Sequence, residues 1–163
     1  MGAQFRANLL HLYNPDVRSE DQGPTWDCLQ FLNWPSYIKI WHRRCSDPLD
    51  MAKWLNFHWA DQGDLLIIEQ DIIAGPWHVA DLRACREPVC AYDYALSNGV
   101  PWTEVPGGTG LGLWKATRDA RMSVEATPPV PLVPWHDLGD ELRKRVGSAH
   151  VHRPLIGHNH RAE

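Results

Sequence analysis

The run Leu65-Leu66-Ile67-Ile68, followed directly by Glu69-Gln70-Asp71, is the stretch from which the fold is best inferred. Four consecutive apolar residues without alternation are typical of a central parallel strand that helices cover on both faces. In open α/β sheets, ligands bind beyond the carboxyl ends of the strands. We therefore expect the middle of the sheet, and a functional site, at this point of the chain.

Strand and helix patterns alternate on both sides of this run. Apolar and β-branched segments predict strands, and apolar residues at helical spacing predict helices. The expected strands are residues 7–13, 37–41, 65–68 and 88–94, and the expected helices are residues 48–62, 76–86 and 137–146. Residues 15–24 and 128–134 predict loops, and residues 26–32 could form a short helical face. This order of βαβ units predicts a single three-layer α/β/α domain over residues 1–163, with a mostly parallel, Rossmann-like sheet.

Composition and charge narrow the class of protein. The 163 residues carry a formal net charge of -4, which argues against a dedicated nucleic-acid binder with a basic surface. No apolar run is long enough to cross a membrane and no secretory signal is visible, so we expect a cytoplasmic protein with reduced thiols. The cysteines form no C-x-x-C pair, which argues against a zinc ribbon. They are Cys28, Cys45, Cys85 and Cys90.

The acidic residues after the apolar run predict a metal site. Residues two apart on an extended chain point to the same side, so Glu69 and Asp71 would present two carboxylates together. Two close carboxylates repel each other unless a cation lies between them, and Mg2+ or Mn2+ prefers such oxygen ligands. The alternative is that the two residues only end a strand and begin a turn.

The segment from Leu65 to Ile72 resembles the DxD-type motif of GT-A glycosyltransferases, although Glu69 stands at the first acidic position and Gln70 in the middle. The resemblance implies a GT-A fold, a UDP- or GDP-linked nucleotide-sugar donor and a bound Mn2+ or Mg2+ ion. It also implies that Asp71 is the more direct metal ligand. The implied activity is transfer of the sugar to an unidentified acceptor hydroxyl.

The histidine-rich segment near the end of the chain fits the same resemblance. Several metal-dependent GT-A enzymes complete their metal site with a late histidine, and His152 or His158 would take that role here. Arg153 would then lie near the diphosphate. Two alternatives are a tail that binds metals adventitiously and an edge strand on which His150 and His152 face the same side.

Two further segments follow in the order that the resemblance implies. Gly108 and Gly110, within the glycine-rich residues 107–112, would shape the donor-sugar pocket, or they form a surface turn. Asp137, with Asp140 in reserve, would be the base that deprotonates the acceptor, which implies an inverting transfer. Asp137 is equally expected as a cap at the helix N-terminus.

The donor nucleotide is expected at the end of the second strand. There Trp41 can stack on a base and Arg43 can contact the diphosphate, although arginines in such a place are also common as solvated charges. Two other functions are compatible with the sequence. One is a metal-dependent phosphohydrolase that uses Glu69, Asp71 and the late histidines, and the other is a non-catalytic sugar-binding domain.

Overall fold

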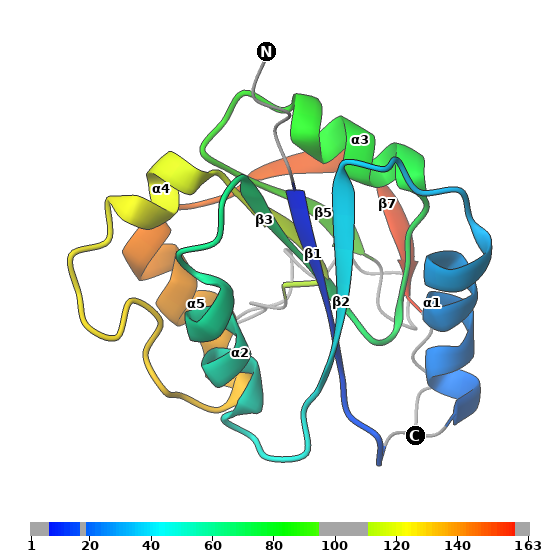
Figure 1. Ribbon diagram of the computed structural model, residues 1–163, viewed down its shortest axis with the longest axis horizontal. Coiled ribbons are helices and arrows are strands. Elements are labelled where there is room, and N and C mark those ends of the chain that lie inside the picture. Colours follow the sequence, from blue (N-terminus) through cyan, green and yellow to red (C-terminus); the bar gives the residue numbers. More distant parts are fainter. Residues whose placement is uncertain (1–6, 17–18, 95–110, 159–163) are drawn as a thin grey trace.

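The computed structural model describes residues 7–16, 19–94 and 111–158, which form one mixed sheet flanked by helices (Figure 1). Six strands lie in the order β2-β1-β3-β6-β5-β7, and β4 extends the row by pairing with the end of β7. The strands are β1 (Ala7–Tyr13), β2 (Ile38–Arg44), β3 (Asp64–Glu69), β4 (Ile72–Ile73), β5 (Val89–Tyr94), β6 (Leu113–Ala116) and β7 (His150–His158). The helices are α1 (Ser19–Phe31), α2 (Asp50–His58), α3 (Pro76–Ala84), α4 (Arg118–Met122) and α5 (Trp135–Val146). None of these helices is long and apolar enough to cross a membrane.

The strands of the sheet run mostly in one direction. β1 pairs in parallel with β2 and β3, and β5 pairs in parallel with β7. β6 lies antiparallel between β3 and β5, and β4 is antiparallel to β7. The predicted α/β class with a mostly parallel sheet is therefore confirmed. β6, whose four residues are all buried, is not among the expected strands.

The four apolar residues of β3 are fully buried, as predicted. Leu65 and Ile67 belong to the hydrophobic core beneath α2 and α5, whereas Leu66 and Ile68 belong to the core beneath α1 and α3. Figure 1 shows α2 and α5 side by side, apart from α1 and α3. Because both faces of the strand are covered, its sequence has no reason to alternate between apolar and polar residues.

The first helix differs from the expectation. The sequence predicts a loop over residues 15–24, but α1 already begins at Ser19. Tertiary contacts explain this difference, since Leu29 is buried in the core and the Thr25 hydroxyl donates to the Ile72 carbonyl at 2.9 Å. A helix without a clear apolar stripe depends on such packing rather than on its own periodicity.

The structure also differs from the expected state of the cysteines. Cys85 and Cys90 form a disulfide, whereas Cys28 and Cys45 are free thiols. The expectation of reduced thiols is therefore wrong for this pair. Cys85 caps the end of α3 and Cys90 is the second residue of β5, so the tight connection between the two elements brings the sulfur atoms together.

A buried arginine holds the connection between α2 and β3. The Arg121 side chain is fully buried, and its guanidinium donates to the carbonyl oxygens of His58, Trp59, Asp61 and Gly63. Burial lowers the pKa of Arg121 to about 10, so the group stays charged at neutral pH. It therefore satisfies carbonyls that the end of a helix would otherwise leave without partners.

Replacing Arg121 is expected to destabilise the whole domain. Arg121→Met keeps an apolar stem but leaves four carbonyl oxygens without this donor, so we expect a loss of about 3 kcal/mol or more in the free energy of unfolding. Urea unfolding followed by circular dichroism measures the change. Arg118→Met, at an exposed position in the same helix, is the matched control and should change stability little. Equal effects of the two substitutions would contradict the role given to Arg121.

Candidate functional site

The strand order reverses at the carboxyl ends of β1 and β3. The chain passes from β1 to β2 on one side, and then returns across β1 to β3 on the other. Its first two helices contribute to opposite cores, α1 to one and α2 to the other. Such a reversal of strand order is where open α/β sheets bind ligands. The loops after the two strands meet here, since the Asn14 backbone N–H donates to the Gln70 side-chain oxygen.

Glu69, one of the two predicted metal ligands, is paired with a glycine backbone at this edge. Its backbone N–H donates to the Gly112 carbonyl at 3.0 Å, and its Oε2 accepts from the Gly112 N–H at 2.9 Å. Gly112 has φ +50° and packs against the Tyr94 ring, where a Cβ atom would lie 2.6 Å from Cδ1 and Cε1. The position therefore requires glycine, and one oxygen of Glu69 helps to hold the start of β6.

The second predicted ligand, Asp71, is half-buried and belongs to a group of carboxylates around Tyr94. Burial raises the pKa of the Tyr94 hydroxyl well above its usual value, and the nearby charges of Glu69, Asp71 and Asp93 raise it further. The hydroxyl thus stays protonated. Three carboxylates therefore lie near one buried hydroxyl at this edge of the sheet.

Glu69 and Asp71 are chosen because they follow a predicted strand, and the same reasoning could have found Asp93 and Tyr94. They end the predicted strand 88–94, and the structure ends β5 at Tyr94. Asp93 is 3% exposed, and its Oδ1 accepts from the Tyr94 backbone N–H at 2.9 Å. Asp93 and Tyr94 are not among the residues expected at the site, although they end a predicted strand as Trp41 does.

The two predicted histidines lie at opposite ends of β7. The His158 backbone pairs with Ile72, the residue after Asp71, so this part of β7 adjoins the acidic edge. His152 pairs with Tyr92 instead, and its Nδ1 lies 2.7 Å from Asp81 Oδ2. Six residues of an extended strand span roughly 20 Å. The structure thus brings the backbone of His158, and not His152, towards Asp71.

The close cluster of metal-ligand atoms in the described part of the chain is a different one. Ligand atoms of Cys85, His150 and His152 all lie within 4.8 Å of one another. Neither Glu69 nor Asp71 belongs to that cluster. The sequence carries the signals as C-x4-C and H-x-H, but only the register of β5 with β7 shows that they meet.

An aromatic cluster that the sequence analysis did not predict lies at the ends of β1 and β2. Trp26 of α1 stacks on His42 at 4.5 Å between ring centroids, and it meets His11 edge-on at 4.7 Å and Tyr13 at 5.2 Å. His11 Nδ1 and His42 Nδ1 are 3.0 Å apart, so one donates and the other accepts. Burial, and secondly His42, lower the pKa of His11 to about 3, and burial lowers that of His42. Both rings are therefore neutral at pH 7.

Trp41 and Arg43, the predicted nucleotide contacts, take part in packing beneath α2. The Trp41 indole donates to Asn8 Oδ1 at 3.0 Å. The Arg43 guanidinium lies 4.7 Å from the Trp41 ring centroid and 4.6 Å from that of Trp54, and its Nε donates to His58 at 3.1 Å. Because strand side chains alternate, His42 between them points to the other face, into the aromatic cluster.

The remaining predicted residues are dispersed. Asp137 is exposed in the first turn of α5, with its Oδ2 3.4 Å from His136 Nε2. The Trp135 N–H donates to Pro48 O, which places this turn beside the segment that follows β2. Arg153 is exposed on β7, and Gly108 and Gly110 lie outside the described residues.

Comparisons with known proteins give no match: no family model, no curated protein and no solved structure corresponds to this chain. The function is therefore argued from the chemistry of the site itself.

Gly112 provides a test of the acidic edge. Gly112→Ala forces a positive φ on a residue with a side chain and drives a Cβ atom into the Tyr94 ring, so we expect a loss of about 1–3 kcal/mol in unfolding free energy. Thermal unfolding monitors the change. Gly23→Ala, within α1, is the control, because its Cβ would meet no atom within 4 Å. A Gly112→Ala protein as stable as the wild type would refute the close packing described.

The aromatic cluster predicts a pH dependence of stability. The folded pKa of His11 lies below its unfolded value of 6.5, so the unfolded chain binds more protons between about pH 3 and 6.5. Stability is full above pH 6.5 and falls as pH drops, by at most about 1.4 kcal/mol per pH unit from this group. His11→Phe should flatten the slope, measured by urea unfolding from pH 7 to pH 4. His136→Gln, at an exposed histidine, should not, and parallel slopes for wild type and His11→Phe would exclude this cause.

Proposed function

We propose that this protein is a metal-dependent glycosyltransferase that moves a sugar from a UDP- or GDP-linked donor to an acceptor hydroxyl. One observation carries the proposal: where the strand order reverses, carboxylates lie at and after the end of β3 and aromatic rings lie at the ends of β1 and β2. A nucleoside diphosphate needs both, because its base stacks on rings and its phosphates bind through a cation. The proposal includes a three-layer, Rossmann-like arrangement of the GT-A type.

The aromatic cluster is the proposed base-binding wall. Trp26 and His42 of this cluster stack on each other, and both side chains are partly exposed to solvent. Both histidines of the cluster are neutral at pH 7, so it contributes stacking rather than charge. In this assignment His42 replaces Trp41 and Arg43 as the contact of β2 with the nucleotide.

The acidic edge fits a hard divalent cation. Glu69, Asp71 and Asp93 supply only oxygen donors, the kind that Mg2+ and Mn2+ prefer, and their mutual repulsion is relieved by a positive charge. Asp71 is the proposed principal ligand, because one carboxylate oxygen of Glu69 already accepts a hydrogen bond from the Gly112 backbone N–H. When bound, the cation would stabilise the negative charge that develops on the departing diphosphate.

The chain's own groups would position and activate the acceptor. In the proposed transfer a bond forms between the acceptor oxygen and the anomeric carbon, the bond from that carbon to the diphosphate breaks, and Asp137 takes the hydroxyl proton. The exposed Asp137 carboxylate at the start of α5 is open to an incoming acceptor. His158, whose backbone adjoins Ile72, is a proposed additional ligand, and Gly108, Gly110 and Arg153 keep the donor-side roles that the resemblance implies.

Asp71 is the residue on which to test the function. Wild-type protein should bind UDP or GDP in calorimetry with Mn2+ present and much more weakly without it. Asp71→Asn should lower the Mn2+-dependent affinity at least about 10-fold, or about 1.4 kcal/mol, because it removes one ligand charge. Trp26→Ala should weaken nucleotide binding while leaving the binding of Mn2+ alone unchanged.

Asp119→Asn, at an exposed aspartate of α4, is the matched control and should behave as the wild type. Slow release of nucleoside diphosphate from a nucleotide sugar, lost in Asp71→Asn, would support the transferase. Absence of nucleotide binding under every metal condition would overturn the proposal, as would nucleotide binding that is independent of metal and of Asp71.

A further inference from the structure

A second group of reactive side chains lies at the other edge of the sheet, where β5 and β7 begin. Ligand atoms of Cys85, His150 and His152 lie within 4.8 Å of one another, and the Cys90 sulfur is bonded to that of Cys85. Four potential ligands, two sulfurs and two imidazoles, therefore converge here. Cys85 follows the last residue of α3, Cys90 is the second residue of β5, and the two histidines are the first and third residues of β7, about 60 positions further along the chain.

The register of two parallel strands explains the convergence. Cys90 pairs with His150, and Tyr92 pairs with His152. Side chains two apart on a strand point to the same side, so both histidines reach the face on which α3 lies. The His150 and His152 rings meet edge-on at 5.1 Å between centroids. Cys85, the C-cap residue of α3, reaches the two histidines from the helix that covers this face.

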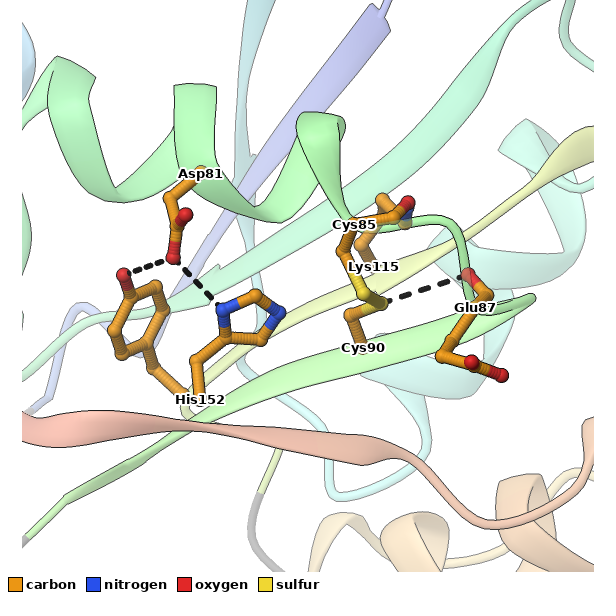
Figure 2. Close-up of a disulfide and its surroundings, with 7 residues drawn as sticks. Asp81, Cys85, Glu87, Cys90, Lys115 and His152 are labelled. Atoms are coloured by element: carbon orange, nitrogen blue, oxygen red, sulfur yellow. Dashed lines mark hydrogen bonds and ion pairs between the residues drawn. A yellow bond between two sulfur atoms is a disulfide. The ribbon is translucent and has the colours of Figure 1, made fainter.

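The two ring nitrogens of His152 have different surroundings. Its Nδ1 is 2.7 Å from Asp81 Oδ2, which also accepts from the Tyr92 hydroxyl at 2.6 Å. The other ring nitrogen, Nε2, is buried and has no hydrogen-bond partner within the described residues. Figure 2 shows this nitrogen directed towards the disulfide and Nδ1 directed towards Asp81. In zinc sites a carboxylate commonly fixes one nitrogen of a histidine in this way while the other nitrogen binds the metal.

We propose that the reduced protein binds a zinc-class transition-metal ion through Cys85, Cys90, His150 and His152, and that the disulfide is the alternative, metal-free state. Two thiolates and two imidazoles are a common tetrahedral zinc set, whereas Mg2+ and Mn2+ prefer oxygen. This site is separate from the acidic edge proposed to bind the donor. It would tie α3, β5 and β7 together through the metal, as the disulfide ties α3 to β5.

The two states exchange through a balanced reaction. A dithiol reductant gives two electrons and two protons to the Cys85–Cys90 bond and becomes a disulfide itself. The two thiols then bind the metal ion as thiolates and release two protons. The Lys115 ammonium, which donates to the Cys85 carbonyl at 2.8 Å, places a positive charge that favours the thiolate form. Because metal and disulfide need the same sulfur atoms, they exclude each other.

Cobalt binding tests the proposal on the full chain. After reduction under anaerobic conditions and removal of the reductant, the protein is titrated with Co2+. We expect one equivalent to bind, with the visible bands of tetrahedral Co2+ and a thiolate-to-cobalt charge-transfer band, and Zn2+ should displace it. The disulfide form should show neither band. Cys85→Ser and His152→Ala should each lose most of the signal, whereas Cys28→Ser should keep it.

Substitutions of Asp81 and Tyr92 distinguish an effect on metal binding from an effect on the stability of the fold. Asp81→Ala should weaken Co2+ binding about 10- to 100-fold by releasing His152. Tyr92→Phe is its matched control, because it removes the other hydrogen bond of Asp81 and leaves that to His152. Asp71→Asn should leave Co2+ binding unchanged, so failure of the nucleotide site and of this site are distinguishable. No thiolate band in the reduced wild type, or a band lost with Cys28→Ser, would overturn the proposal.

Discussion

The hydrogen bonds of the Arg121 guanidinium are the constraint on which the rest of this structure depends. They fix the carbonyls at the end of α2 and in the turn that leads into β3. β3 in turn pairs with β1 on one side and β6 on the other, so its position sets the relation between the two halves of the sheet. The acidic residues lie at its far end. A charged group buried in α4 thus helps to position the strand that carries these acidic residues, and its desolvation is offset by the carbonyl dipoles that it binds.

The two edges of the sheet offer different ligand chemistry. The carboxyl edge gathers oxygen donors around Tyr94, and the other edge gathers sulfur and imidazole beside α3. The donor atoms at the two edges therefore suit different ions, since oxygen suits hard cations whereas sulfur and imidazole suit zinc-class ions. His152 illustrates the division. From the sequence, His152 is expected to lie near Asp71. Its hydrogen bond with Asp81 and the register of β7 instead place it beside Cys85 and α3.

Secondary structure that depends on neighbouring residues could be predicted from the sequence, whereas contacts between distant segments could not. The apolar run of β3 and the helices α3 and α5 follow from residues close together in the chain. β6 is short and follows glycines, and α1 is held by contacts with β4 and the core, so no local period reveals either. For the site, the acids after β3 could be predicted. The aromatic cluster and the cysteine–histidine group could not, because each is assembled by strand register across many intervening residues.

The irregular pairing of β5 with β7 has a consequence for how this chain tolerates insertions and deletions. Between the pairs Tyr92–His152 and Tyr94–Ile156, β5 advances by two residues and β7 by four. The surplus on β7 is even, so Ile156 still points into the core, where it is 4% exposed. Loss of a single residue from positions 153–155 would reverse the side on which every later residue of the strand emerges. Loss of two would restore a regular ladder and keep the inward side, so length variation in this segment should be accepted in pairs.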